Sequence, residues 1–208
     1  MRTPTARSSL APIGAVLFGA IIAFASEAST EDSAEALVKS TTDNVLRILE
    51  KERDVIEKDP GRIYGIVDEY IIPNFDFERM SQRVLGKFWQ RATKDQQDRF
   101  QAQFQTLLVR TYATALREYS NQKVEFLPSR PRGDGEVSVR TQIVQTGGPP
   151  ISIDYELRKN SEQWKVYDVT IEGVSLVINY RSTFASEIRT NGLDALIERL
   201  AKHNQQKQ

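Results

Sequence analysis

Histidine and cysteine, the residues used most often for nucleophilic catalysis and for binding transition metals, are almost missing from this chain. It has a single histidine, His203, close to its last residue, and no cysteine. A Ser-His-Asp triad needs an imidazole held firmly in place, which is hard to achieve at such a position. Zinc, iron and copper sites lack their usual ligands. We therefore expect neither a catalytic triad nor a metal site.

Carboxylates are the remaining candidates for acid–base chemistry, and most of them have a simpler explanation. Asp95 and Asp98 fall at the start of a predicted helix, where acids interact favourably with the helix dipole. Asp154 and Glu156 lie on the polar side of a predicted strand, so a solvated sheet face accounts for them. Asp168 differs, because both of its neighbours in sequence are large and apolar. A buried acid of this kind is a candidate general base.

The sequence lacks the features that hold nucleotides or nucleic acids. Gly133-x-Gly135 and Gly147-Gly148 come between predicted strands, so we interpret them as hairpin turns rather than phosphate-binding loops. The formal net charge is zero. Such a balance gives no electrostatic reason to bind nucleic acid, and no polybasic segment to hold the chain on anionic lipid. We expect no cofactor and no nucleic-acid partner.

The first residues have the pattern of a secretory signal peptide. Arg2 and Arg7 precede an uncharged apolar stretch that ends in Ala23-Phe24-Ala25, which has the A-x-A form of a cleavage site. The stretch is shorter than the roughly 20 residues that a membrane-spanning helix needs. We expect cleavage after Ala25, which makes residues 1–25 the signal peptide and residues 26–208 one secreted domain. An uncleaved N-terminal anchor is the alternative.

Apolar residues at helical spacing predict helices before and after a strand region. The clearest helix begins at Thr93, where Thr93 and Gln96 have the spacing of a capping box. Asp59-Pro60 is a typical helix start, and Asn191-Gly192 is a typical helix end. The predicted helices are residues 30–58, 60–72, 76–85, 93–119, 175–190 and 193–203.

Between these helices the apolar period changes to two, which predicts four antiparallel strands. They cover residues 124–126, 137–143, 151–157 and 167–171. Each strand has one apolar and one polar face, so helices should cover only one side of the sheet. Separate runs of helices and strands are typical of an α+β fold. The interior is then either a solid core, which is commoner, or a ligand cavity.

Several motifs are specific enough to identify a family. They are Pro73-x-x-Asp76-Phe77-x-x-Met80, Val84-Leu85-Gly86-x-x-Trp89, Ala92-Thr93-x-x-Gln96, Phe100-x-x-x-Phe104-x-x-Leu107-Leu108-x-Arg110-Thr111-Tyr112 and Gly173-Val174-Ser175-Leu176-Val177-x-Asn179-Tyr180-Arg181-x-x-Phe184. With these motifs the chain resembles the MlaC, or toluene-tolerance, family of periplasmic phospholipid-binding proteins over nearly all of its length after the signal peptide. Lys94 departs from the proline of many members but leaves the Thr93 cap intact.

The resemblance implies a protein without catalytic residues that takes the acyl chains of phospholipid into an apolar pocket between the sheet and the helices. It implies a periplasmic location and two protein partners. One is an outer-membrane lipoprotein complex (MlaA-like), and the other is an inner-membrane ABC transporter with its membrane-anchored substrate-binding subunit (MlaD-like). Such a protein shuttles phospholipid between the membranes and thereby maintains the lipid asymmetry of the outer membrane.

No motif marks individual lipid contacts, so the pocket lining is a hypothesis drawn from the apolar strand face, the long helix and the helix after Ser175. Arg110 and Arg181 are candidates for contact with a headgroup phosphate at the pocket mouth, and a salt bridge or a contact with a helix C-terminus is the alternative. The residues expected to line the pocket are Leu107, Leu108, Tyr112, Val139, Ile143, Ile153, Tyr155, Val169, Ile171, Leu176, Tyr180 and Phe184.

Three functions therefore compete at the level of the sequence. The first is the phospholipid shuttle. The second is a small-molecule enzyme of a cone-shaped α+β fold that uses a buried carboxylate such as Asp168. The third is a structural or chaperone domain with a solid core. The enzyme needs a carboxylate inside its cavity, whereas the shuttle needs none. No long heptad pattern is present, so we expect a monomer.

Overall fold

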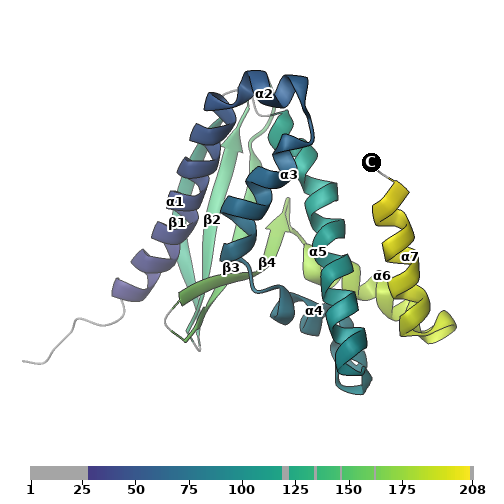
Figure 1. The fold of residues 1–208 in the computed structure, drawn as a ribbon. Helices are drawn as coiled ribbons and strands as arrows, with labels where there is room; N and C mark the ends of the chain where they lie inside the picture. The colour runs from purple at the N-terminus through teal and green to yellow at the C-terminus, as the bar shows by residue number, and fades with distance from the viewer. Residues whose placement is uncertain (1–27, 119–121, 134, 146, 162, 207–208) are drawn as a thin grey trace, which may run out of the picture.

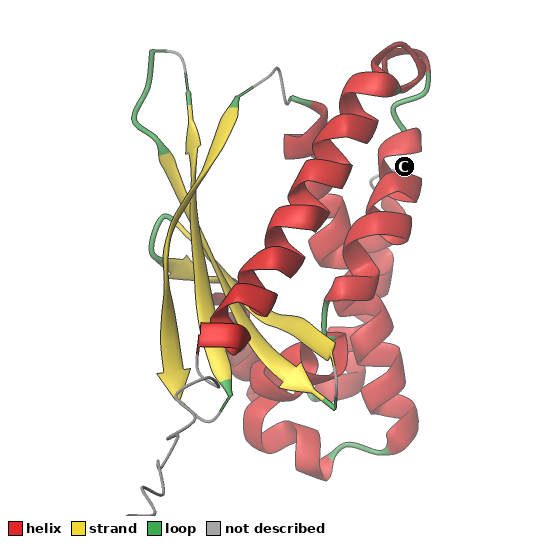
Figure 2. Ribbon diagram, turned by 90° about the vertical axis from the view of Figure 1, so that its left-hand side faces the viewer, coloured by secondary structure: helices red, strands yellow, loops and turns green. Residues whose placement is uncertain are grey.

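A single antiparallel sheet and a layer of helices make up the part of the chain that the computed structural model describes (Figures 1 and 2). This part comprises residues 28–118, 122–133, 135–145, 147–161 and 163–206. The predicted signal peptide lies outside these residues. None of the helices within them has the length and apolar character needed to cross a membrane. The predicted α+β class is confirmed.

The sheet has five strands, so the prediction of four strands is wrong. Each strand pairs antiparallel with the next, in the order β1-β2-β3-β4-β5. The additional strand is β5, which follows a reversal at Glu172 and Gly173, where φ is 48° and 78°. Two residues are too few to show an alternating pattern, which explains why the sequence did not reveal this strand. The strands are β1 (Lys123–Gly133), β2 (Glu136–Val144), β3 (Ile151–Asn160), β4 (Gln163–Ile171) and β5 (Val174–Ser175).

The edge strand β1 is irregular. It contains Pro128 and Pro131, and its register with β2 shifts between Leu127 and Arg130 and again between Pro131 and Gly133. Proline has no N–H to donate to a ladder, which confines it to edge strands and bulges. The end of β1 that leads into the turn toward β2 is therefore a poor template for a further strand.

The first predicted helix is two helices, α1 (Ala28–Lys51) and α2 (Arg53–Lys58). The break falls at Glu52, whose carboxylate accepts hydrogen bonds from Arg62 Nε at 2.6 Å and Nη2 at 3.1 Å. This ion pair ties the break to the first residue of α3 (Arg62–Ile66). The apolar stripe continues across the break, so the stripe by itself predicted one long helix.

The helix predicted from Pro60 is also different in the structure. Asp59 accepts a hydrogen bond from the Gly61 amide at 3.0 Å, so a turn precedes the helix. The chain then forms α3 (Arg62–Ile66), a π-helical turn η1 (Val67–Ile71) and a 3₁₀ turn η2 (Ile72–Asn74). Pro73 has no N–H and its ring clashes with a regular preceding turn, which accounts for the irregular end.

The remaining helices begin and end close to the predicted residues because their caps are strong. Asp76 accepts from the Arg79 amide at the start of α4 (Phe77–Leu85), which runs into η3 (Gly86–Arg91). The predicted capping box of Thr93 and Gln96 begins α5 (Lys94–Arg117) and is confirmed in both directions, at 3.2 Å and 3.0 Å. Gly192, with φ of 84°, separates α6 (Leu176–Asn191) from α7 (Leu193–Gln206).

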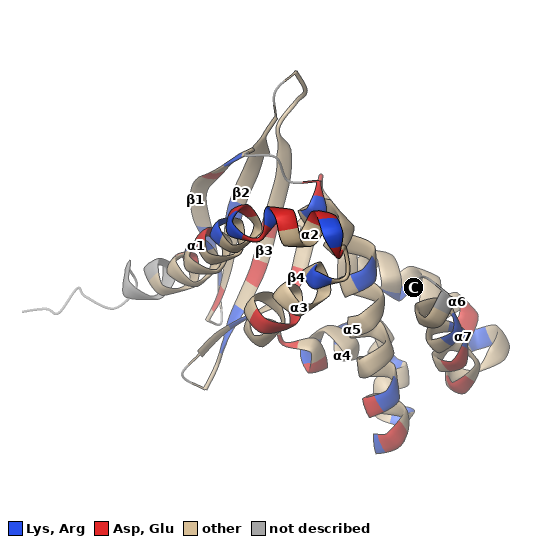
Figure 3. Ribbon diagram, turned by 45° about the horizontal axis from the view of Figure 1, so that its top comes forward, with Lys and Arg blue, Asp and Glu red and all other residues tan. Residues whose placement is uncertain are grey.

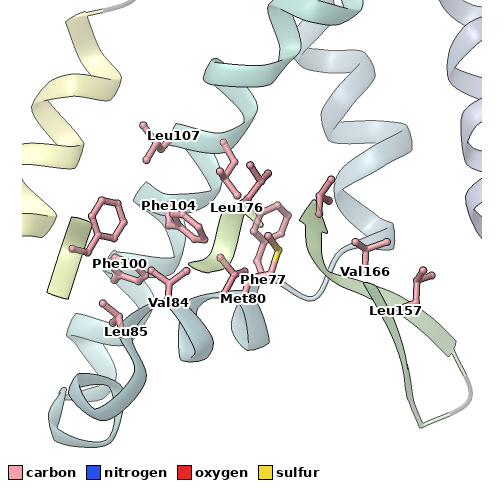
Figure 4. Close-up of a cluster of buried hydrophobic side chains, with 14 of the residues drawn as sticks. Phe77, Met80, Val84, Leu85, Phe100, Phe104, Leu107, Leu157, Val166 and Leu176 are labelled. Atoms are coloured by element: carbon pink, nitrogen blue, oxygen red, sulfur yellow. The ribbon is translucent and has the colours of Figure 1, made fainter. Parts of the chain in front are cut away.

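Two apolar clusters hold the layers together. The larger one lies between β2–β4 and the helices α1 and α4–α7. The rings of Phe100 and Phe104, labelled in Figure 4, stack within it, and Phe184 meets both edge-on. The smaller one joins α1, α2 and α3 to the C-terminal half of α5. The closest backbone approaches to the sheet come from α1, α4 and α6, whereas α5 packs mainly on α3, α4 and α7.

The Thr93 cap offers a direct test of what begins α5. Replacing Thr93 with Ala removes the acceptor for the Gln96 amide, so the free energy of unfolding should fall by about 1 kcal/mol. Urea unfolding measures the difference. Thr190→Ala is the control, because Thr190 lies in the last turn of α6 and bonds only the Ser186 carbonyl. Equal stability of the two variants would contradict a role for the capping box.

Candidate functional site

The apolar face of the sheet is built from rows of side chains that run across the strands. Because paired residues point to the same face, the observed register places them side by side. The rows begin at the end where β2 stops and β3 starts. In order they are Val124, Ile143 and Ile151; Phe126, Thr141, Ile153 and Ile171; Val139, Tyr155 and Val169; and Val137, Leu157 and Val166.

Burial decreases steadily from the last of these rows to the first. Val137, Leu157 and Val166 are at most 3% exposed. In the next row Val139 and Val169 are buried, but Tyr155 is only half-buried. In the two rows at the other end every apolar residue is half-buried. The apolar face is therefore closed at one end and incompletely covered at the other.

Two helices bring half-buried aromatic side chains to the same cluster. Tyr112 of α5 and Tyr180 of α6 pack against the larger cluster, as do the partly covered residues of the sheet. Tyr180 also meets Phe104 edge-on, with ring centroids 5.4 Å apart. We call this set the half-buried strip. Its members are Tyr112, Phe126, Ile153, Tyr155, Ile171 and Tyr180.

The polar atoms of the strip are uncharged. Burial raises the pKa of Tyr112, of Tyr155 and of Tyr180 above the usual tyrosine value, so these phenols stay neutral. The neighbouring Thr141 hydroxyl, which is buried, donates to the Ile153 carbonyl at 2.9 Å. Such a surface suits aliphatic chains and offers nothing that performs acid–base chemistry at neutral pH.

The predicted lining residues divide into two groups by burial. One group is half-buried at the open end of the sheet face and on the helices beside it: Tyr112, Ile143, Ile153, Tyr155, Ile171 and Tyr180. The other group belongs to the buried cluster, where each residue is at most 8% exposed: Leu107, Leu108, Val139, Val169, Leu176 and Phe184. Figure 4 shows Leu107 and Leu176 packed inside this cluster. Every residue of the second group is therefore part of the hydrophobic core.

Arg181 belongs to α6, and its side chain lies at the C-terminal end of α4. A Cβ atom on Gly86, the C-terminal cap of α4, would come within 3.1 Å of Arg181 Nη2. The guanidinium thus covers the C-terminus of α4, where a cation is favourable, and this is the alternative that the sequence left open for Arg181. Gly86 also has φ of 53°, so both its backbone and its surroundings favour glycine. The contact joins two of the sequence motifs.

Arg110 lies on the side of α5 away from Tyr112. Residues two positions apart in a helix point in nearly opposite directions, and Tyr112 packs toward the larger cluster. Arg110 instead lines a surface hollow of about 440 Å³ between α3 and α5. The lining of this hollow is Pro60, Gly61, Ile63, Tyr64, Arg110, Thr114 and Arg117.

A second hollow of about 440 Å³ lies between the start of α1, η2 and β4. Its lining is Ser33, Leu37, Pro73, Asn74, Gln163, Trp164 and Lys165. Neither of these two hollows contains a residue of the half-buried strip or of the predicted lining. The predicted lining residues that stay partly exposed therefore lie at the open end of the sheet face and on α5 and α6, outside both hollows.

Asp168 has a structural role. Its side chain is 4% exposed; Oδ1 accepts from the amides of Val169 at 2.8 Å and Val177 at 3.1 Å, and Oδ2 accepts from the Ser175 hydroxyl at 2.6 Å. These bonds attach β4 to the first turn of α6, where a negative charge is stabilising. With these partners, and with no place in either hollow, Asp168 is not positioned as a general base.

The sheet face opposite the helices is less solvated than its alternating pattern suggests. Glu156 is 9% exposed and accepts hydrogen bonds from Ser138 at 3.0 Å and Arg132 at 2.9 Å. Of the described residues, no three histidine or acidic side chains come together in a way that would hold a metal ion. On the polar face of the sheet, Glu156 is thus held by hydrogen bonds to side chains of β1 and β2.

Sequence reasoning missed two features of this region. Phe126 belongs to the half-buried strip because it pairs with Thr141, but its strand position alone did not distinguish it from other apolar residues. The hollow beside Arg110 combines two segments that are about 50 positions apart in sequence. The i, i+4, i+7 spacing of Arg110, Thr114 and Arg117 was the available signal for its α5 side.

Comparison with known proteins connects this arrangement to a family. The profile of the MlaC protein family matches residues 39–202. The chain is 28% identical over 177 residues to the intermembrane phospholipid transport system binding protein MlaC of Haemophilus influenzae, a match covering 83% of each chain. It is 27% identical over 159 residues to the toluene tolerance protein ttg2D of Pseudomonas putida, covering 76% of this chain and 74% of that protein.

A solved structure shares the fold. The phospholipid-binding protein of Ralstonia solanacearum, determined in complex with a phospholipid, superposes with a TM-score of 0.77 and is 36% identical. The match covers 84% of this chain and 98% of that one.

The Asp168 bonds give a test of its structural role. Asp168→Asn should lower the free energy of unfolding by about 2 kcal/mol, because the neutral amide is a weaker acceptor for the two backbone amides. Thermal or urea unfolding checks this. Asp98→Asn, which breaks only the exposed pair with Lys94, serves as control and should change stability by less than about 0.5 kcal/mol. An unchanged stability of the Asp168 variant would contradict the assignment.

Proposed function

The chain belongs to the MlaC family, and from this premise we propose that it binds phospholipid through the acyl chains and carries it between the outer and inner membranes. Two of its relatives are named as a phospholipid transport binding protein and a phospholipid-binding protein, not as enzymes. The observation that carries the proposal is the match to a protein solved with a phospholipid, which this chain covers almost completely. Maintenance of outer-membrane lipid asymmetry is the role that such transfer serves.

The half-buried strip supplies the physical basis for binding. Each CH₂ group removed from water gains about 0.8 kcal/mol, so two acyl chains laid against apolar side chains offset their removal from the bilayer without any reaction. The strip is uncharged at neutral pH and lies where the helical layer leaves the sheet incompletely covered. The headgroup can then remain in water, and we expect weak headgroup selectivity.

We assign the predicted lining to two depths. The half-buried residues Ile143, Ile153 and Ile171 of the sheet face the chains first, together with the tyrosines of the strip. The buried residues of the predicted lining form the floor against which the chain ends rest. Arg181 caps α4, so its contact with a headgroup is secondary to that role.

The location and partners follow from the same premise. We propose that residues 1–25 direct the chain to the periplasm, where it works as a monomer. There it would exchange lipid with an outer-membrane lipoprotein complex (MlaA-like) and with an inner-membrane ABC transporter through its membrane-anchored substrate-binding subunit (MlaD-like). A named relative from an intermembrane transport system supports this assignment.

Native mass spectrometry of protein purified from a periplasmic extract, with organic extraction of the same sample, tests the proposal. We expect about one diacyl phospholipid bound per protein. The measured mass gives the number of bound acyl chains. A bare mass for protein that also refuses added labelled phospholipid would overturn the shuttle and favour a domain that binds protein.

Replacing Ile153 with Glu tests the site itself. Because Ile153 is half-buried, a carboxylate there should leave the fold intact but make burial of acyl chains unfavourable, so that at least tenfold less lipid copurifies. Ile178→Glu is the matched control, since Ile178 is 63% exposed and should keep its lipid. Leu108 suits this test less well, because it is 7% exposed and a charge there would cost folding free energy. Undiminished lipid in the Ile153 variant would remove this residue from the site.

A further inference from the structure

We propose that the hollow between α3 and α5 is a phosphate-binding site, separate from the acyl site. Three polar residues of α5, Arg110, Thr114 and Arg117, line one side of it. Their i, i+4 and i+7 spacing places them on one face of the helix, and the two arginines are about 10 Å apart along the axis. Side chains of this length can converge on a group held between them.

The two arginines lack counter-charges within the protein. Ion pairs engage other arginines of the helical layer, such as Arg62 with Glu52 and Arg99 with Asp194. For Arg110 and Arg117, no carboxylate among the described residues lies within ion-pair distance. Figure 3 shows basic residues on the upper part of α5, beside α2 and α3. Two cations on one helix face, about 10 Å apart along the axis, give this side of the hollow a positive charge that favours a bound anion.

The opposite side of the hollow is largely apolar. Pro60, Ile63 and Tyr64 come from the turn before α3 and from α3 itself. Asp59, next to Pro60 in the sequence, accepts a hydrogen bond from the Gly61 amide at 3.0 Å. Arg110 is half-buried beside this apolar wall, which strengthens its hydrogen bonds to an anion, whereas Arg117 is exposed at the rim of the hollow.

The chemistry of the lining favours phosphate over a carboxylate. Two guanidinium forks and the Thr114 hydroxyl offer more donors than one carboxylate can accept, whereas phosphate presents several oxygens in different directions. A volume of about 440 Å³ admits a phosphate with a small substituent but not a pair of acyl chains. The same group occurs in free phosphate compounds and in lipid headgroups, so the test must separate these two sources.

The proposal does not depend on the acyl site. Arg110 faces away from Tyr112, so the hollow and the half-buried strip are on different sides of α5. Loss of phosphate binding with retained phospholipid would therefore concern this hollow alone. Loss of copurified phospholipid would concern the proposed function alone.

The test uses the purified protein, its double variant Arg110→Gln with Arg117→Gln, and a charge-matched control, Arg189→Gln with Lys202→Gln. Both control residues are exposed and lie in α6 and α7. Inorganic phosphate is titrated while backbone amide shifts are followed by NMR. We expect saturable shifts at Gly61, Tyr64 and Thr114, at least tenfold weaker binding in the double variant, and unchanged binding in the control.

A second arm measures flotation with vesicles of phosphatidylglycerol at a fixed ionic strength. Flotation that requires both arginines, together with phosphate binding, identifies a lipid headgroup as the source. Phosphate binding with flotation equal in all three proteins identifies free phosphate compounds. The proposal is overturned if phosphate causes no saturable shifts at these residues, or if the control loses affinity as much as the double variant does.

Discussion

The sheet's apolar face must be covered, and the helical layer covers only part of it. Rows of side chains that are equally apolar range from fully buried at one end to half-buried at the other. The Asp168 bonds hold α6 against β4, and α4 packs on the same strand, while α5 packs mainly on other helices. The Asp76 amide donates to the Val166 carbonyl at 2.8 Å, which holds the start of α4 at the end where the rows are fully buried.

This distribution explains how a chain with little reactive chemistry can still have a specific task. In the proposed function the acyl chains have no polar groups to recognise, so area, shape and the absence of charge would do the recognition. The tyrosines of the strip contribute large apolar rings whose hydroxyls stay neutral because burial raises their pKa. Polar residues elsewhere serve the fold, as Glu156 does through Ser138 and Arg132.

Prediction from sequence succeeded where a local interaction decides the structure. The caps at Asp76 and Thr93 involve residues three positions apart, so their spacing was sufficient to begin α4 and α5 correctly. It failed where distant contacts or a backbone break decide, as at Glu52 and Pro73, and where β5 was too short to show a period. The sequence also did not show how burial changes along a strand. Ile151 and Leu157 fit the same alternation, yet Ile151 is half-buried and Leu157 is fully buried, at opposite ends of the apolar face.

The prolines of β1 have a consequence for how such a protein survives in a crowded compartment. A carrier that keeps apolar side chains partly open cannot also present a regular strand edge, because the two together would favour self-association into fibrils. Pro128 and Pro131 interrupt the donor pattern along one edge of the sheet, and at the other edge β5 is only two residues long. Strand addition is thereby discouraged along β1 and along the two residues of β5.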